Sequence, residues 1–148
     1  MSTSAALPYS MRTALTQGPL LRVVTGSRLH GFAHGGSDHD AWVVVPEPRD
    51  VSATLAAKRI FQAIDRHEHA DGATTVTDVT YVGVDTFLGY VANGVPQALE
   101  ALFAPEPEVD RLGPFRLAYR VNPHAMRASY RRMLCHIVSD PVRAADAK

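Results

Sequence analysis

Short, mainly apolar runs bounded by turn-forming residues alternate along the chain with segments whose apolar residues recur at helical spacing. Residues 20–25 and 40–45 have the length and composition of buried strands, and Pro46 ends the second. Residues 74–84 are rich in Thr and Val and alternate in polarity, which also predicts a strand. The remaining pattern predicts helices over residues 10–17, 27–31, 51–66, 85–93, 96–103 and 123–138. This order predicts an α+β or α/β fold in which helices pack on a small mixed β-sheet.

The helix predicted over residues 51–66 depends on a capping residue and an apolar face. Asp50 or Ser52 is suited to the N-cap position. The apolar face would consist of Ile60, Phe61 and Ile64. Turn-forming residues then predict a loop over residues 67–72.

Two aspartates at the start of the second strand are the main candidates for chemistry. Asp38 and Asp40 are two residues apart, so on a strand both carboxylates project from one face and His39 projects from the other. Two close carboxylates repel each other, and burial raises their pKa values further, so keeping both charged costs free energy. A bound divalent cation offsets this free-energy cost by neutralising the charges. Oxygen ligands suit Mg²⁺, which also takes substrate phosphates as ligands.

The turn after the first strand precedes this acid pair by ten residues and is suited to phosphate. Gly26 allows the backbone to approach a ligand closely. Ser27 is placed to cap the helical turn over residues 27–31, whose first N–H groups would then point outward as an anion site. A phosphate cradle this close to a metal-binding acid pair predicts a nucleotide site.

A third acid lies on the strand over residues 74–84. On that strand Asp78 shares a face with residues that are typical of a hydrophobic core, so a charged side chain is unexpected at this position. One interpretation is an acid on an edge strand or at a strand end. The acid pair upstream favours the other interpretation, in which Asp78 is a third metal ligand.

The ordered motifs resemble those of a known superfamily. The dipeptide Gly26-Ser27, a spacer of ten residues and Asp38-His39-Asp40 resemble the signature of nucleotidyltransferases related to DNA polymerase beta. The surrounding residues are similar to a bacterial and phage branch of predicted nucleotidyltransferases. Thr77-Asp78-Val79 and the segment 93–105 resemble the acid-bearing strand and the following helices of that branch. The resemblance covers roughly residues 20–135.

The resemblance implies a role for each matching residue. Asp38 and Asp40 match the carboxylates that hold two Mg²⁺ ions, with Mn²⁺ as a substitute, and Asp78 matches the third carboxylate. Gly26 and Ser27 match the pair that grips the triphosphate, and Arg28 would assist them. The implied reaction transfers a nucleoside monophosphate from a nucleoside triphosphate to an acceptor hydroxyl on a protein, an RNA or a small molecule, and releases pyrophosphate. The alternative is a catalytically inactive module on the same fold that binds a nucleotide or a partner.

Charge is distributed unevenly along the chain. Residues 1–110 hold 7 lysines and arginines against 13 acids, whereas residues 111–148 hold 8 against 2, so the net charges are −6 and +6. The last predicted helix, capped by Asn122 with Pro123 at its first position, lies in this basic segment. Its arginines indicate either a solvated face docked on an acidic body or a site for triphosphate or RNA.

Length and composition place these motifs in one globular domain. We expect a flexible tail over residues 1–9 and a single domain over residues 10–148. A single cysteine excludes a disulfide within the chain, and the absence of a signal-like start or a long apolar run predicts a cytoplasmic protein that does not bind membranes. Because the chain ends soon after the last matching helix, a helical protein partner is one expected source of acceptor recognition.

Other side chains offer competing interpretations. His30, His34 and His39 suggest a zinc site, but they lie near a glycine-rich loop and lack a zinc motif, and a surface loop is expected for His67 and His69. Cys135 is expected to fill a core position on the last helix. Trp42 is expected in the core, with stacking on a nucleobase as the alternative.

Overall fold

The structure is a computed structural model that describes residues 7–34, 37–47, 60–68 and 74–139. Its strands are β1 (Leu21–Thr25), β2 (His39–Val45), β3 (Ile60–Glu68), β4 (Thr74–Gly83) and β5 (Val109–Asp110). Its helices are α1 (Tyr9–Thr16), α2 (Gly26–Leu29), α3 (Val84–Ala92), α4 (Pro96–Phe103), α5 (Gly113–Ala118) and α6 (Pro123–Ser139). The described part of the chain therefore has the mixed composition that the sequence predicts.

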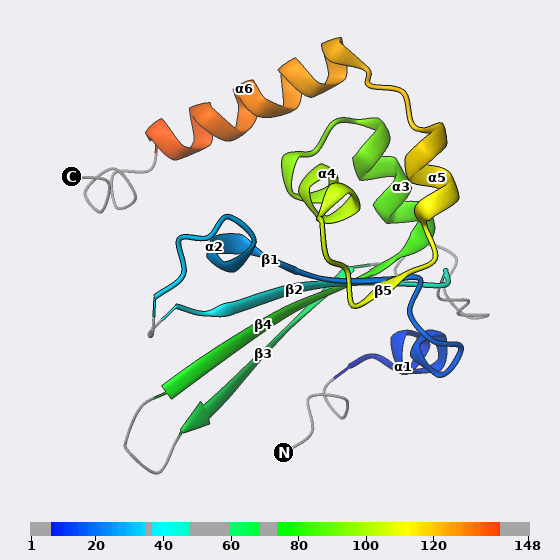
Figure 1. Cartoon of the computed structure of the whole chain (residues 1–148), viewed down its shortest axis with the longest axis vertical. Coiled ribbons are helices and arrows are strands. Elements are labelled where there is room, and N and C mark those ends of the chain that lie inside the picture. Colours follow the sequence, from blue (N-terminus) through cyan, green and yellow to red (C-terminus); the bar gives the residue numbers. More distant parts are fainter. Residues whose placement is uncertain (1–6, 35–36, 48–59, 69–73, 140–148) are drawn as a thin grey trace.

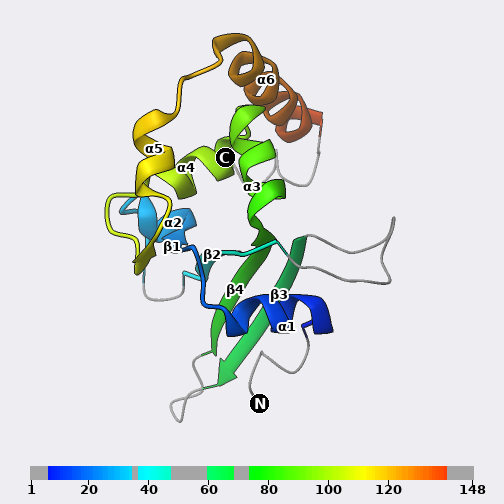
Figure 2. The same cartoon turned by 90° about the vertical axis from the view of Figure 1, so that its right-hand side faces the viewer.

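The five strands form one mixed sheet in the order β3-β4-β2-β1-β5. The central pair, β2 and β4, is parallel, and the other neighbouring pairs are antiparallel. Helices α3 and α4 lie on one side of the sheet and α1 on the other, while α6 lies beyond α3 and α4 (Figures 1 and 2). The predicted fold, a small mixed sheet with helices packed on it, is confirmed.

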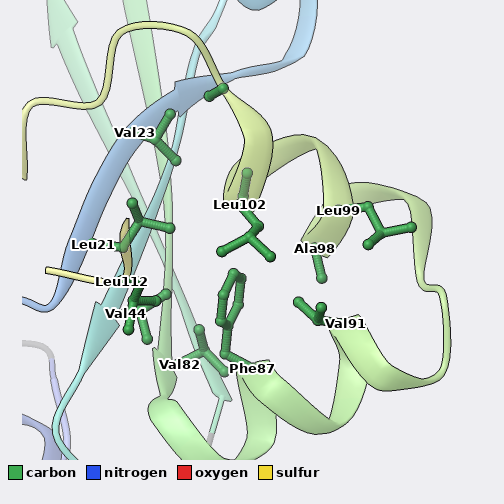
Figure 3. Packing of buried hydrophobic residues seen from close by; sticks show 12 residues of the cluster. Leu21, Val23, Val44, Val82, Phe87, Val91, Ala98, Leu99, Leu102 and Leu112 are labelled. Carbon is green, nitrogen blue, oxygen red and sulfur yellow. The ribbon is translucent and has the colours of Figure 1, made fainter. Parts of the chain in front are cut away.

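Alternation of side chains along β2 supplies both sides of the sheet with a core. Val43 and Val45 belong to a buried cluster with residues of α1, including Met11. Val44 belongs to a second cluster with residues of α3 and α4, among them Phe87, which points into the space between the sheet and these helices (Figure 3). The continuous apolar run of β2 is explained by burial on both faces.

The helix predicted over residues 51–66 is wrong for its described part. Residues 48–59 lie outside the described residues, but Ile60–Glu68 is strand β3, paired antiparallel with β4. Phe61 and Ala63 pack in the cluster beneath α1, whereas Ile60 and Ile64 are exposed on the opposite face. The apolar spacing fitted a helix, and pairing along the whole of β4 stabilises the strand instead. Because β3 includes His67, the predicted loop over residues 67–72 starts too early.

A short segment between α4 and α6 was not predicted. Strand β5 pairs with β1, and α5 follows it. The Arg116 guanidinium forms an ion pair of 2.7 Å with Asp110 and also donates a hydrogen bond to the Leu102 carbonyl. These contacts hold the segment to the end of α4.

Helix α6 docks on the turn between α3 and α4. The Ser129 hydroxyl is buried and donates a hydrogen bond of 2.8 Å to the Asn93 carbonyl. The cap predicted at Asn122 is confirmed, because its Oδ1 accepts a hydrogen bond from the Ala125 N–H at 3.1 Å. Gly94 has a φ of +66°, and a β-carbon there would lie 2.5 Å from the Met126 Cα. Only glycine therefore allows α6 to approach this turn so closely.

We expect Gly94→Ala to destabilise the protein by about 2–4 kcal/mol, because it combines left-handed backbone strain with an overlap against α6 backbone. Gly18→Ala is the matched control for strain, since Gly18 has a φ of +81° but its nearest neighbours are flexible Arg111 atoms at 3.6 Å and beyond. Chemical denaturation would measure both losses, and amide exchange in α6 would show whether the helix loosens. Equal destabilisation by the two variants would contradict the role given to the α6 contact.

Candidate functional site

A row of polar side chains crosses three neighbouring strands at the end of the sheet near α2. Asp40 on β2 is paired in register with Asp78 on parallel β4 and with Thr25 on antiparallel β1. Paired residues on neighbouring strands share a face and lie about 5 Å apart. The structure thus brings together two of the three acids that the sequence singles out.

This row forms the floor of an open cleft of about 240 Å³, hereafter the acid cleft. It lies on the same face of the sheet as α4, which supplies part of its wall. The residues that line the acid cleft are Thr25, Gly26, Asp40, Ala41, Trp42, Gln62, Asp78, Thr80, Gln97 and Glu100. The acid pair is therefore accessible to a ligand.

Gly26 makes room for the Asp40 carboxylate at the corner of the acid cleft. Gly26 has a φ of +67°, and a β-carbon there would overlap Asp40 Oδ2. Helix α2 begins at Gly26, and the residue before the helix is Thr25, so the predicted cap at Ser27 is wrong. The first N–H groups of α2 lack helical acceptors by the geometry of any helix start. The corner thus places exposed backbone donors beside a carboxylate.

The electrostatic environment of Asp40 is unfavourable to its charge. Partial burial raises the pKa of the Asp40 carboxyl, and repulsion from Asp78 and then Asp38 raises it further, while His39 acts in the opposite direction. A group that pays this cost in the folded state is a candidate for function. A bound cation would remove the cost by neutralising the repulsion.

The Asp78 carboxylate has one occupied and one unoccupied oxygen. Gln62 Nε2 donates a hydrogen bond of 2.6 Å to Asp78 Oδ2. Asp78 Oδ1 is buried and has no hydrogen-bond partner within the described residues. Since buried oxygens are normally paired, Oδ1 is suited to a ligand that the protein itself does not supply.

The acid cleft fits a divalent cation, although it is not a preformed metal cage. Among the described residues, no group of three His, Cys, Asp or Glu side chains is arranged to hold a metal ion. The donors that are present, carboxylates of Asp40 and Asp78 with an unpaired oxygen, are the hard ligands that Mg²⁺ prefers. Mg²⁺ usually binds through one or two carboxylates together with water and substrate phosphates, so a complete protein cage is not required.

The other predicted site residues lie around the acid cleft and are not part of its lining. Asp38 is exposed just before β2 and acts on Asp40 through its charge. Arg28 Nη2 donates a hydrogen bond of 3.3 Å to the Ser37 carbonyl, so this side chain ties α2 to the segment that carries Asp38. Arg28 also lines a separate groove on the outer side of β1 with Val24 and Glu106. Neither Ser27 nor Arg28 lines the acid cleft.

Polar residues of the acid cleft that were not predicted from the sequence include Gln62, Gln97 and Glu100. Gln62 was hidden because it lies in the segment predicted as a helix, and only its strand register brings it beside Asp78. Gln97 and Glu100 are three residues apart on α4, so they lie on one side of that helix. Polar residues interrupting the apolar sequence of α4 were a signal for this face.

Expectations for the remaining candidate residues have mixed outcomes. Trp42 packs edge-on against Phe87, with ring centroids 5.9 Å apart, and it also lines the acid cleft. The expected packing against the core is confirmed, and stacking on a nucleobase stays a prediction. Cys135 is exposed on α6, so the expected core position is wrong. His30 Nε2, directly after α2, lies 3.6 Å from Oε2 of Glu100 on α4.

A mixed five-stranded sheet with helices packed on it is the fold of nucleotidyltransferases of the polymerase beta type. The sequence model of the RNA repair pathway DNA polymerase beta family, RlaP, matches residues 11–136, and the chain belongs to this family. The resemblance stated from the motifs is thereby confirmed. No curated protein and no solved structure matches the chain. Within the described residues, none of the helices combines the length and the apolar character needed to cross a bilayer.

Proposed function

We propose that this protein is a magnesium-dependent nucleotidyltransferase that transfers a nucleoside monophosphate from a nucleoside triphosphate to a hydroxyl of RNA. The observation that carries this proposal is the register pairing of Asp40 with Asp78 on the floor of the acid cleft, together with a buried Asp78 oxygen that has no hydrogen-bond partner within the described residues. Membership of an RNA repair family favours RNA over a protein or a small molecule as the acceptor.

In the proposed reaction the acceptor hydroxyl oxygen forms a bond to the α-phosphorus, and the bond from that phosphorus to the bridging oxygen of the β-phosphate breaks. Pyrophosphate leaves, and the hydroxyl proton passes to a carboxylate of the acid cleft and from there to solvent. Bound Mg²⁺ ions would lower the pKa of the hydroxyl and neutralise charge on the leaving phosphates. Asp40 and Asp78, with Asp38 at the rim, would hold these ions.

The remaining side chains of the site would position the substrates. The backbone N–H groups of Gly26 and Ser27 would donate hydrogen bonds to the triphosphate. Arg28 would hold that turn in place through its hydrogen bond to the Ser37 carbonyl. Gln62 would keep Asp78 in one rotamer, because it occupies Oδ2 and leaves Oδ1 available. Positioning of this kind supplies most of the protein's share of phosphoryl transfer.

A second candidate is a nucleotide-binding module on the same fold that does not catalyse transfer. It is favoured by the exposed position of Asp38, which does not line the acid cleft, and by the lack of a preformed three-residue metal group in the described part of the chain. In this case nucleotide would bind without chemistry.

Incubating the full chain with Mg²⁺, a short RNA and each nucleoside triphosphate labelled at the α-phosphate separates these candidates. We expect labelled RNA and free pyrophosphate, with Mn²⁺ able to replace Mg²⁺ and with Asp38→Ala abolishing both products. An RNA whose terminal hydroxyls are blocked is the matched acceptor control. Nucleotide binding without turnover on RNA, protein or small-molecule acceptors would favour the module, and stoichiometric zinc by elemental analysis would favour the zinc interpretation.

A further inference from the structure

Helix α6 presents positive charge that the proposed active site does not use. Arg127, Arg131 and Arg132 are exposed, and the sequence from 123 to 139 contains no acidic residue. Within the described residues neither Arg127 nor Arg131 has an ion-pair or hydrogen-bond partner. By contrast, Arg22 on β1 forms an ion pair of 2.7 Å with Glu108. The arginines of α6 are therefore available to a ligand.

One side of α6 packs on the body of the protein and so orients the arginines. Met126 contacts the core cluster, and Ser129 is buried against the turn at Asn93. Arg127 and Arg131 are four residues apart, so they lie on the same side of the helix. Both are exposed, whereas Met126 and Ser129 face the body of the protein, so the two arginines lie on the outer side. In Figures 1 and 2 this helix lies beyond α3 and α4 with no other helix covering its outer side.

A groove connects α6 to the neighbourhood of the acid cleft. This α4–α6 groove, of about 390 Å³, is lined by Val95, Pro96, Gln97, Ser129, Arg132 and Met133. Gln97 lines both this groove and the acid cleft. Arg132 thus lines a groove that shares Gln97 with the acid cleft, and its Nη2 donates a hydrogen bond of 3.2 Å to Ser129 Oγ.

The charge of the acid cleft explains why an RNA would need such a surface. Asp40, Asp78 and Glu100 all line the acid cleft, so the cleft repels phosphates that arrive without cations. Arginines bind phosphate through a planar fork of donors, and their charge attracts a polyanion at long range. Positive charge placed beside a negative active site would hold the RNA while its reacting end enters the cleft.

We propose that the outer face of α6 binds the phosphate backbone of the RNA acceptor through Arg127 and Arg131, and that Arg132 guides the strand along the α4–α6 groove into the acid cleft. This inference rests on the proposed function, because it takes RNA as the acceptor. Contacts made by arginines to phosphates read no bases, so the surface binds RNA with little preference for sequence.

The test measures binding of a labelled single-stranded RNA to the full chain by fluorescence anisotropy at several salt concentrations, without nucleotide. For the double variant Arg127→Gln with Arg131→Gln we expect at least about tenfold weaker binding. The slope of the logarithm of the binding constant against the logarithm of the salt concentration should become shallower by about 1.4, which is about 0.7 for each of the two lost phosphate contacts. Binding of nucleoside triphosphate by the double variant should stay unchanged, and circular dichroism would confirm that it is folded. Arg131→Lys should keep most of the affinity, because it keeps the charge.

Arg12→Gln is the matched control for Arg131→Gln. Arg12 is an exposed arginine on α1, which packs on the opposite face of the sheet. Removing this charge should leave RNA binding within about twofold of the wild type. Equal losses in the two single variants, or an unchanged salt dependence in the double variant, would overturn the proposal. Displacement of RNA by polyglutamate at an equal concentration of charges would also overturn it, because the surface would then bind any polyanion.

The outcomes for α6 and for the transferase are separable. If the double variant loses RNA binding while the wild type transfers no nucleotide, then the surface is supported and the proposed function is wrong. If the wild type transfers nucleotide to RNA and the double variant binds RNA normally, then the function stands and the surface is wrong.

Discussion

Asp40→Asn is expected to reduce nucleotidyl transfer by about a thousandfold or more while making the metal-free protein more stable at neutral pH. Asp40 is paired in register with Asp78, and the charges of both Asp78 and Asp38 act on it, so we expect its carboxylate to be a ligand of the bound metal. A thousandfold loss corresponds to about 4 kcal/mol of transition-state stabilisation, which is the size expected when metal-ion catalysis is lost. The asparagine removes a charge that partial burial and two like charges disfavour, so its effect on folding has the opposite sign.

The pH dependence of stability provides an independent measurement of the same repulsion. Because the pKa of Asp40 is raised above 3.8 in the folded protein, the folded state holds this proton more tightly than the unfolded chain. The wild type therefore gains stability from this group as the pH falls through the folded pKa towards 3.8, and loses it as the pH rises. The stability advantage of Asp40→Asn should be largest at neutral pH and should fade on acidification.

Thermal unfolding of both proteins at several pH values, with and without Mg²⁺, would measure these effects. We expect Mg²⁺ to raise the midpoint of the wild type and to raise that of Asp40→Asn much less. Glu106→Gln is the control, because it removes an exposed carboxylate outside the acid cleft. If Asp40→Asn kept full transfer activity, or if Mg²⁺ stabilised both proteins equally, the metal-binding role of Asp40 would be wrong.

The positions of the acids show which features of the site can be predicted from the sequence alone. Alternation predicts that Asp40 projects from one face of its strand, and it predicts the same for Asp78, so the candidates are found locally. Their meeting depends on β2 and β4 being neighbours in parallel register, although β3 lies between them in the chain. Strand order is a property of long-range packing, and the family resemblance anticipated only that Asp78 joins the other two acids in one site.

The failures of sequence reasoning also have physical causes. Ile60, Phe61 and Ile64 have a spacing that suits one face of a helix, and only pairing with β4 makes Ile60–Glu68 a strand. Gln62 was therefore missed, although it holds Asp78. Cys135 lies in an apolar stretch but is exposed, whereas α6 meets the body of the protein through the side that carries Met126 and Ser129. Local pattern cannot tell which side of an apolar helix meets the body of the protein.

Gly26→Ala is the second variant with a large expected effect, and its cause is the contact with Asp40. An alanine there would adopt a left-handed φ near +67°, which costs about 1–2 kcal/mol, and its β-carbon would overlap Asp40 Oδ2. Relieving that overlap requires the carboxylate or the corner to move, at a further cost of about 1–3 kcal/mol. A shift of about 1 Å in a positioned group lowers catalysis by about a hundredfold, so we expect at least that loss in transfer.

Gly31→Ala separates the strain from the contact. Gly31 has a φ of +72°, so an alanine would be strained to a similar degree, but among the described residues no atom other than those of its chain neighbours lies within 4 Å of its would-be β-carbon. We expect Gly31→Ala to lose about 1–2 kcal/mol of unfolding free energy and to keep its activity and its Mg²⁺ affinity. Gly26→Ala should lose more stability and bind Mg²⁺ more weakly, as measured by calorimetric titration. If the two alanine variants had equal activity and equal Mg²⁺ affinity, the glycine corner would have no part in placing the Asp40 carboxylate.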